Sequence, residues 1–264
     1  MRLTGRIPFG AGSRDDAQRA VRVLRGAVEL GVNHVDTAAF YRSSLHSSNE
    51  LIRTALWPYP ENFVIATKVM PDRFRGGPSL RDQVEENRND LGVDSLEMVY
   101  LRAMEGAALV DDFIELSKMR DEGLIRNLAL SGVTEQQLGD ASAIAPVTAI
   151  QNRYGIGVRR DESVLRAATA RSIAFVPYFS IAAEGKHSGP AKEDHADVRD
   201  VATAHGVSVA AVRIAWTLEL GANVLAIPGT GSLQHLEENV AAAQLQLTPD
   251  EVALLSAVPP PQPA

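Results

Sequence analysis

Charged residues end three short apolar runs of this 264-residue sequence. Asp36 closes "NHVD", Lys68 closes "VIATK" and Arg102 closes "LEMVYLR". Apolar runs of this length are typical of buried strands, where a charge needs a partner. An aspartate beside a lysine stays ionised, and an ammonium beside a phenol lowers the pKa of that phenol. Tyr41, which follows Asp36 in the same stretch, could therefore act as a general acid near neutral pH.

Each of these residues also has a simpler explanation. An aspartate at a strand end often caps the next helix, a lysine can extend its ammonium to solvent, and a tyrosine there usually packs. The combination is more informative, because in a parallel barrel the residues at the strand ends meet at one mouth. We therefore expect Asp36, Tyr41, Lys68 and Arg102 to share one site.

The elements that must position these residues alternate between two kinds of segment. Short apolar runs lack the alternation that marks a half-exposed strand, which predicts parallel strands covered on both faces. Amphipathic segments lie between them, and several end at a glycine, the usual end of a helix. The predicted strands are residues 33–38, 63–69, 96–102, 125–131, 147–154, 173–180 and 224–230. The predicted helices are residues 15–30, 80–91, 109–122, 135–143, 162–171 and 208–220.

This order predicts an α/β fold of the (β/α)8 TIM-barrel type, with a shortened first strand and N-terminus. Residues 1–5 ("MRLTG") would supply that first strand, and a single domain would cover residues 1–264. An open doubly wound sheet is disfavoured, because no GxGxxG motif follows the first strand. We also expect a lid in the polar loop of residues 182–194. Residues 259–264 should form a disordered tail.

Composition argues against several classes of partner. The net charge is −7 and no basic cluster occurs, so we do not expect binding to nucleic acid. No apolar run approaches the roughly 18 residues of a membrane helix. The chain has no cysteine, which excludes disulfides and thiolate chemistry and fits a cytoplasmic protein. His46, His187 and His195 lack the spacing of metal ligands, so we predict no metal site.

The last predicted strand leads into a second kind of site. "IPGTGSLQHLEEN" runs from that strand through a Gly-Thr-Gly-Ser turn into a helix. Free N–H groups at a helix start favour an anion such as phosphate, and the last two loops of a TIM barrel commonly bind one. An ordinary helix cap by Ser232 would explain the same stretch.

The motifs together resemble the aldo-keto reductases. The resemblance rests on "GVNHVDTAAFY", "NELIRTAL", "VIATKV", "LSGVT", "IQNRY" and "IPGTGSLQHLEENVAAA", which occur in the family's order between residues 15 and 258. It implies a (β/α)8 barrel that binds NADPH and reduces aldehydes and ketones through an Asp–Tyr–Lys–His tetrad. Asp36, Tyr41 and Lys68 match three members. Arg102 stands where the histidine is usual, as in the bacterial branch that includes pyridoxal reductase.

The resemblance also implies the residues that bind the cofactor. Ser131 and Gln151 would hold the nicotinamide carboxamide, although the family's asparagine after the serine is replaced by Gly132. Tyr178 would stack on the nicotinamide, followed by Phe179 and Ser180 in the cofactor loop. Thr230, Gly231 and Ser232 would hold the 2′-phosphate, and Glu238 and Asn239 the adenine. In the cofactor site, Gly229 and His235 stand where many members place a Lys or Arg on that phosphate. We expect NADPH in preference to NADH.

Three functions are compatible with these residues. The first is NADPH-dependent reduction of a small-molecule carbonyl, with pyridoxal or another small aldehyde as substrate and Tyr41 as proton donor. The second is an NADPH-binding regulatory or non-catalytic subunit, which the unusual Gly132 and Arg42 suggest. The third is a phosphosugar isomerase or aldolase, which the phosphate site alone suggests. The sequence gives no indication of the oligomeric state.

Overall fold

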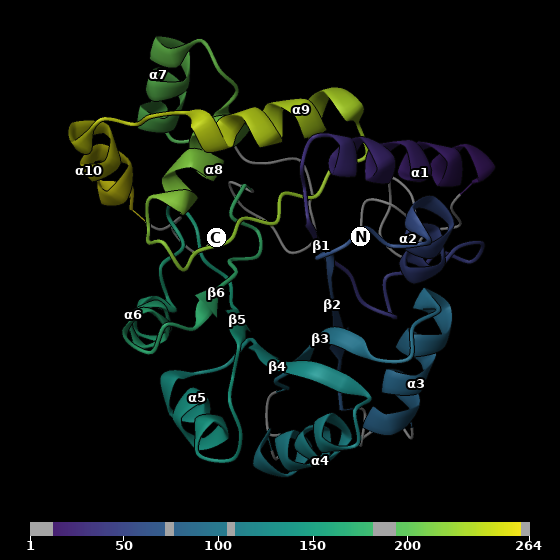
Figure 1. Cartoon of the computed structure of the whole chain (residues 1–264). Helices are drawn as coiled ribbons and strands as arrows, with labels where there is room; N and C mark the ends of the chain where they lie inside the picture. Colours follow the sequence, from purple (N-terminus) through teal and green to yellow (C-terminus); the bar gives the residue numbers. More distant parts are fainter. Residues whose placement is uncertain (1–12, 72–76, 105–108, 182–193, 260–264) are drawn as a thin grey trace. The chain divides into compact units, whose positions relative to one another are not determined.

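The computed structural model describes residues 13–71, 77–104, 109–181 and 194–259 (Figure 1). It divides into two compact units, Met1–Gln151 with Gly229–Leu233, and Asn152–Pro228 with Gln234–Ala264. The expected first strand, nearly all of the expected lid and residues 260–264 of the expected tail lie outside the described residues. The single domain over residues 1–264 stays a prediction.

The first unit contains a parallel sheet whose strands follow the order of the chain. The strands are β1 (His34–Asp36), β2 (Val64–Val69), β3 (Leu96–Arg102), β4 (Ile125–Ser131) and β5 (Ala149–Gln151). Lys68 lies opposite Tyr100 in the register, and Arg102 lies opposite Ser131. Because neighbouring parallel strands point the same way, the charged residues at their carboxyl ends are brought to one edge.

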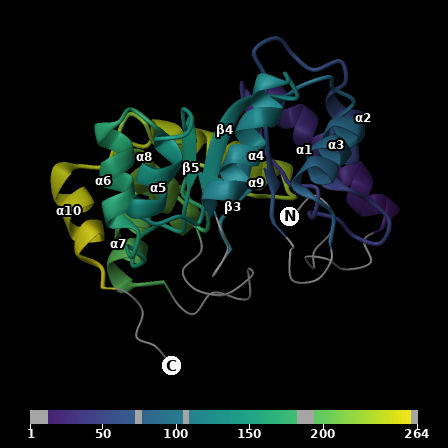
Figure 2. The ribbon, with the colours of Figure 1, turned by 90° about the horizontal axis from the view of Figure 1, so that it is seen from below.

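Helices cover this sheet in chain order, and each packs against the next (Figures 1 and 2). They are α1 (Arg14–Glu29), α2 (Ser48–Leu56), α3 (Leu80–Leu91), α4 (Leu109–Asp121) and α5 (Glu135–Ser142). Four of these agree with the predicted helices to within two residues at each end. The helix α2 was expected only as part of the motif "NELIRTAL". It begins with a capping box in which Ser47 and Glu50 bond each other's backbone N–H groups.

The second unit is mostly helical. It holds α6 (Glu162–Ala170), β6 (Ala174–Phe175), α7 (Ala196–His205), α8 (Val209–Leu218), most of α9 (Leu233–Ala241), η2 (Ala242–Gln244) and α10 (Pro249–Ala257). Its core is organised by the buried Trp216, whose ring stacks on Tyr154 with 6.3 Å between centroids. The indole Nε1 donates to Ser256 Oγ over 3.0 Å, which ties α8 to α10.

Four predicted strands are much shorter than expected. Residues 33–38 form only β1 and residues 147–154 only β5, each three residues long. Residues 173–180 form only the two-residue β6, and residues 224–230 make a single bridge from Val224 to Phe175. Pro177 and Pro228 interrupt these runs, and a proline has no N–H to donate to a strand ladder. The apolar composition was a correct guide to burial at Ile173, Phe175 and Val176, but not at Leu225, which is 38% exposed, and not to the length of regular strand.

The helix α3 offers a test of how local signals fix this fold. Ser79 accepts a hydrogen bond from the Asp82 N–H over 3.1 Å, and Asp82 Oδ2 accepts from the Ser79 N–H over 3.1 Å. We expect Ser79→Ala to lower the free energy of unfolding by about 1 kcal/mol, because the first turn loses its cap. Ser79→Thr keeps the hydroxyl and serves as the control in urea unfolding. Equal stability of Ser79→Ala and the unchanged chain would contradict this role.

Candidate active site

A buried ion pair lies at the ends of β1 and β2. Lys68 Nζ lies 2.6 Å from both carboxylate oxygens of Asp36, and the two side chains are 4% and 12% exposed. The Thr37 carbonyl accepts from the same ammonium over 3.1 Å. Burial lowers the pKa of Lys68, and the Asp36 carboxylate acts in the opposite direction by stabilising the ammonium.

Tyr41 lies in the loop that follows β1, next to this pair. Its ring centroid is 5.3 Å from Lys68 Nζ, and Phe40 packs edge-on against the ring at 5.0 Å. The loop is held at both ends, since the Tyr41 N–H donates to Ala38 and its carbonyl accepts from Ser48, each over 2.9 Å. The Lys68 ammonium therefore lies over the Tyr41 ring, and its expected action on the phenolic oxygen stays a prediction.

Arg42, the unusual residue after Tyr41, helps to hold the same loop. Its Nε donates to the Ala39 carbonyl over 3.0 Å, and its guanidinium pairs with Glu86 on α3. Arg42 also forms an antiparallel bridge with Ser47. The arginine at this position thus adds contacts to the loop that carries Tyr41.

Arg102 and Gly132 form a matched pair at the ends of β3 and β4. One guanidinium nitrogen donates to Ser131 Oγ over 3.1 Å. Gly132 has φ +70°, and a Cβ there would lie 2.6 Å from the Arg102 nitrogen Nη1 and 2.9 Å from Cζ. Such distances are shorter than van der Waals contact, so a larger residue at 132 would displace the flexible end of the Arg102 side chain from this position. The absence of an asparagine side chain is the counterpart of the arginine.

Gln151 joins the ion pair from β5. Its side-chain Nε2 donates to Asp36 Oδ2 over 2.7 Å, and the residue is 2% exposed. Its carbonyl accepts from the Gly132 N–H over 2.9 Å. In this structure the expected cofactor ligand therefore completes the hydrogen bonding of Asp36. The first unit brings together Asp36, Tyr41, Lys68, Arg102, Ser131 and Gln151.

Two further residues near the pair were missed in the sequence. Tyr100 is fully buried, its ring centroid lies 5.6 Å from Lys68 Nζ, and burial together with the Asp36 charge raises its pKa. Burial lowers the pKa of His34, whose ring nitrogens have no hydrogen-bond partner in the part of the chain that the structure describes. His34 and Tyr100 each stand two positions before a charged residue of the site. The alternation of side chains along a strand would have indicated their shared face.

The second unit holds the expected aromatic part of the cofactor site. The Tyr178 N–H donates to the Asn152 carbonyl over 3.0 Å, and its ring meets Phe179 edge-on at 5.3 Å. Phe179 has φ +62°, a left-handed conformation that is rare outside glycine. Ser180 is buried, and its backbone leaves only 3.3 Å for a Cβ at Gly155. The turn therefore depends on close backbone packing, and its contact with a cofactor stays a prediction.

The expected phosphate-binding turn has a local hydrogen bond of its own. The Ser232 N–H donates to Thr230 Oγ1 over 3.0 Å just before α9 begins. Within α9, Gln234 Nε2 donates to Glu238 Oε1 over 3.1 Å. The roles of Gly229, Thr230, Gly231, Ser232, His235, Glu238 and Asn239 stay predictions.

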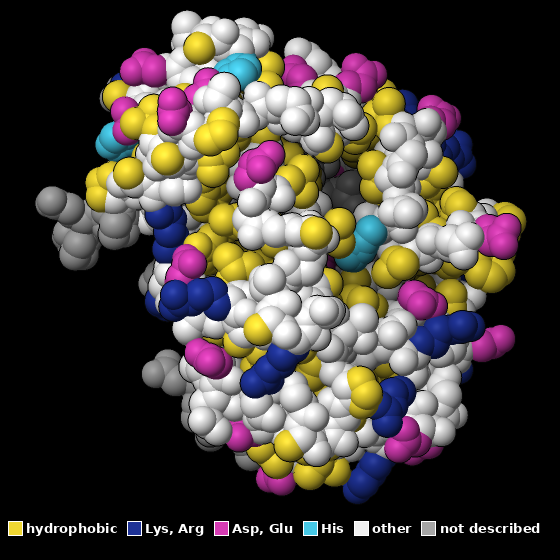
Figure 3. Space-filling view, turned by 60° about the vertical axis from the view of Figure 1, so that its left-hand side comes forward, with side chains coloured by type: hydrophobic (Ala, Val, Ile, Leu, Met, Phe, Trp, Pro, Cys, Tyr) yellow, Lys and Arg dark blue, Asp and Glu magenta, His cyan; other side chains and the backbone are white. Residues whose placement is uncertain are grey.

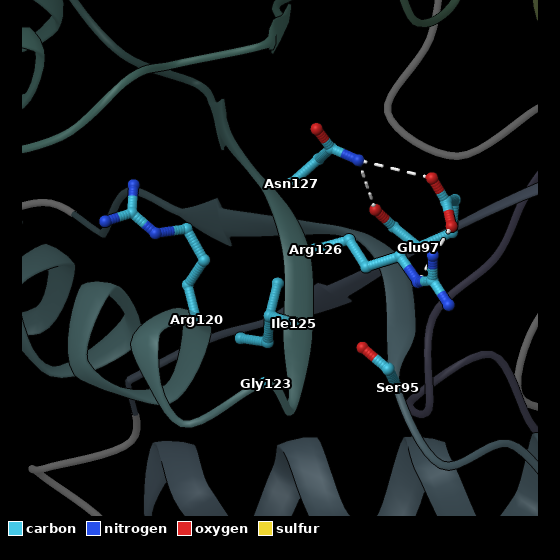
Figure 4. Close-up of a pocket in the computed structure, with 7 residues that line it drawn as sticks. All are labelled: Ser95, Glu97, Arg120, Gly123, Ile125, Arg126 and Asn127. Atoms are coloured by element: carbon cyan, nitrogen blue, oxygen red, sulfur yellow. Dashed lines mark hydrogen bonds and ion pairs between the residues drawn. The ribbon is translucent and has the colours of Figure 1, made fainter.

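A sizeable pocket opens at the other ends of the strands (Figure 4). It has a volume of about 630 Å³ and lies where β3 and β4 begin, whereas the charged site lies where they end. Its lining residues are Ser95, Glu97, Arg120, Gly123, Ile125, Arg126 and Asn127. Glu97 already accepts from Asn127 and pairs with Arg126, so the pocket presents a satisfied polar surface without a reactive group.

The described residues also bear on metal, membrane and nucleic-acid sites. No group of three or more His, Asp or Glu residues there could hold a metal ion. No single described helix is long and apolar enough to cross a membrane; α7 and α8 pass only as a pair bent by 96°. On the face in Figure 3, Lys and Arg side chains lie among Asp and Glu side chains without forming a basic patch.

Comparison with known proteins identifies the family. A model described as "Aldo/keto reductase family" matches residues 4–259. Pyridoxine 4-dehydrogenase of Escherichia coli (strain K12) is 35% identical over 273 residues, which cover 98% of this chain and 92% of that protein. Methylglyoxal reductase YeaE of the same strain is 27% identical, covering 91% of this chain and 85% of that protein.

Solved structures agree with the sequence comparisons. The crystal structure of an aldo-keto reductase from Klebsiella pneumoniae in complex with NADPH superposes with a TM-score of 0.82 at 25% identity. The match covers 98% of this chain and 93% of that chain. The chain belongs to the aldo-keto reductase family, so the expected (β/α)8 barrel class and the expected oxidoreductase are confirmed.

The ion pair should be as important for stability as for chemistry. Lys68→Met leaves the Asp36 carboxylate buried without its counter-ion, so we expect the free energy of unfolding to fall by about 3–5 kcal/mol. The double variant Asp36→Asn with Lys68→Met removes both charges and should recover part of that loss. Urea unfolding of the three proteins measures both effects. A double variant less stable than Lys68→Met would show that the buried charge is not the cause.

Proposed function

We propose that this chain reduces a small aldehyde to the alcohol with NADPH, and that pyridoxal is the first substrate to test. The observation that carries the proposal is the buried Asp36–Lys68 pair with its ammonium 5.3 Å from the Tyr41 ring centroid. The similarity to pyridoxine 4-dehydrogenase supports a vitamin B6 aldehyde as substrate. The absence of cysteine in the sequence supports a cytoplasmic location.

The residues of the first unit divide the chemistry among them. When bound, NADPH supplies the hydride that a carbonyl carbon accepts. Tyr41 gives its phenolic proton to the carbonyl oxygen, which gains negative charge as the C=O double bond becomes a single bond. Lys68 makes that proton easier to release, because an ammonium stabilises a neighbouring phenolate. Asp36 keeps the ammonium charged and in place through both of its oxygens.

The donors available in this chain fit NADPH. Ser131 Oγ and the Gln151 amide lie at neighbouring positions in the register of β4 and β5, which suits a carboxamide that both donates and accepts. Thr230 and Ser232 offer hydroxyl groups, and Ser232 precedes the start of α9, where an anion is favoured. The resemblance adds Tyr178 as the residue that stacks on the nicotinamide.

Arg102 is the residue that would set the choice of aldehyde. Its guanidinium is permanently charged and can bind an oxygen anion through two N–H groups. Pyridoxal carries a phenolic oxygen beside its aldehyde, so one cation can contact both oxygens. Ser131 Oγ holds one guanidinium nitrogen, which limits the positions that the group can take.

The departures that suggested a non-catalytic subunit have structural explanations. Gly132 provides the space that the Arg102 guanidinium occupies, and Arg42 ties down the loop that carries Tyr41. Neither change removes a member of the Asp36, Tyr41 and Lys68 set. These observations favour catalysis over a purely regulatory role.

The role of Tyr41 as proton donor can be tested by removing a single atom. Tyr41→Phe removes the phenolic oxygen, so we expect NADPH-dependent reduction of pyridoxal to fall by at least about a thousandfold, a large general-acid effect. Binding of NADPH, followed by quenching of its fluorescence, should be retained. Tyr59→Phe is the control, because the Tyr59 hydroxyl only donates to the Leu91 carbonyl, over 2.6 Å. Turnover retained in Tyr41→Phe would refute the proposed role.

The selectivity of Arg102 can be tested by comparing two substrates. A hydrogen bond to a charged group contributes about 1.5–3 kcal/mol, which corresponds to roughly 10- to 150-fold. We therefore expect Arg102→His to lower kcat/KM for pyridoxal by about that factor more than for a neutral aldehyde. Arg102→Lys keeps the charge but not the paired N–H donors. Its kcat/KM for pyridoxal should therefore lie between those of the unchanged chain and of Arg102→His. Equal losses of kcat/KM on both substrates would show that Arg102 does not select the aldehyde and has only a general role in the reaction.

A further inference from the structure

A chain of buried polar side chains lies on the other side of the strands that carry the ion pair. We call it the asparagine network, and it links β1 and β2 to α2 and α3. None of its members is more than 1% exposed. Its members are Thr37, Ser48, Asn49, Thr67 and Asn87.

Four hydrogen bonds of the network have a defined donor and acceptor, whereas either hydroxyl can donate in the 2.9 Å contact between Thr37 and Ser48. Thr37 Oγ1 donates to Asn49 Oδ1 over 2.8 Å, and Asn49 Nδ2 donates to Asn87 Oδ1 over 2.8 Å. The Thr67 hydroxyl donates to the same Asn87 oxygen. Asn87 Nδ2 donates to the Gln83 carbonyl over 2.7 Å, which anchors the chain in α3. The two asparagines therefore have both their oxygen and their nitrogen occupied, and neither amide can turn over without breaking bonds.

The network and the ion pair are attached to the same two stretches of backbone. Thr37 follows Asp36 directly, and Thr67 precedes Lys68 directly. Side chains alternate between the two faces of a strand, so Thr67 lies on the face of β2 opposite to Lys68. Thr37 directly follows β1, and its hydroxyl bonds Asn49 on α2. The Thr37 carbonyl is in addition the third acceptor of the Lys68 ammonium, at 3.1 Å.

Burying five polar side chains costs free energy unless each is hydrogen-bonded, and apolar residues would fill the same space without that cost. A network of this kind restricts the positions of the groups to which it is bonded. Here the network bonds the hydroxyls of Thr37 and Thr67, and it thereby restrains the residues next to Asp36 and Lys68. The distance from Tyr41 to the ammonium depends on both, because Thr37 lies between Asp36 and the Tyr41 loop.

We propose that Thr37, Thr67, Asn49 and Asn87 are positioning residues for the Lys68 ammonium. They fix the Thr37 carbonyl and the end of β2, so that the ammonium faces Tyr41 and not only Asp36. The inference rests on the proposed function, in which Tyr41 donates the proton. It adds residues that touch neither substrate nor cofactor but determine how readily that proton is released.

Pairs of variants at the two threonines separate hydrogen bonding from shape. Thr37→Val and Thr67→Val keep the branched side chain and remove only the hydroxyl, whereas Thr37→Ser and Thr67→Ser keep the hydroxyl. Thr217→Val is the matched control, since Thr217 is equally buried and its hydroxyl donates to the Arg213 carbonyl within α8 over 2.7 Å. All five variants are compared with the unchanged full chain for Tm, for KM and kcat with NADPH and pyridoxal, and for the pH profile of kcat.

We expect each valine variant in the network to lower kcat by about tenfold to a hundredfold, the effect of a small misplacement of a reacting group. KM should change little, and the limb of the pH profile that reports Tyr41 should move to higher pH, because the ammonium acts on it less. The serine variants should recover most of kcat. Thr217→Val should lower Tm without altering kcat or the pH profile.

The inference is overturned if Thr37→Val and Thr67→Val lower Tm but keep kcat and the pH profile, as expected for Thr217→Val. If Thr37→Val does not fold, Thr67→Val alone decides between the two outcomes. Failure of the proposed function gives a different result, namely no NADPH-dependent turnover by the unchanged chain. In that case ultraviolet difference titration of the tyrosines, with Tyr41→Phe as reference, still measures whether the network shifts the ionisation of Tyr41. An unchanged titration in both valine variants would again overturn the inference.

Discussion

The buried contact between Asp36 and Lys68 is the constraint on which the rest of the site depends. Two charges withdrawn from water are costly, and their attraction repays the cost only when the remaining hydrogen-bonding capacity is also used. Here the Lys68 ammonium has the Thr37 carbonyl, and Asp36 has the Gln151 amide. The register of parallel strands supplies these partners, because β1, β2 and β5 all end at the same edge of the sheet. The fold of the first unit is thus also the means by which the charges are tolerated.

The sequence indicated the charged residues at the strand ends better than it indicated the strands of the second unit, and the catalytic roles of those residues stay predictions. Asp36, Lys68 and Arg102 could be found because each interrupts an apolar run of its own strand. The bond from Gln151 to Asp36 joins residues 115 positions apart, and no local pattern contains that information. The asparagine network was missed for a similar reason, since buried asparagines on helices look like exposed ones until their partners are known. In the second unit, Pro177 and Pro228 shortened strands that composition alone had indicated.

Gly132 shows how one departure from a family pattern can explain another. Taken alone, the missing asparagine suggested a weakened cofactor site. The 2.6 Å that separates a Cβ at this position from the Arg102 guanidinium shows that the two residues must be considered together. Glycine also adopts φ +70° without steric strain. The turn after β4 can therefore form at the point where the guanidinium approaches. The pair is a coherent alternative solution and not two independent losses.

The arginine also acts on the ammonium that tunes the proton donor. An arginine stays charged at every pH at which the protein is folded, whereas a lysine can lose its proton when burial disfavours the charge. The charge of Arg102 therefore adds to burial in lowering the pKa of Lys68, and only Asp36 opposes them among the causes identified. A substrate oxygen anion bound to Arg102 would offset part of that repulsion.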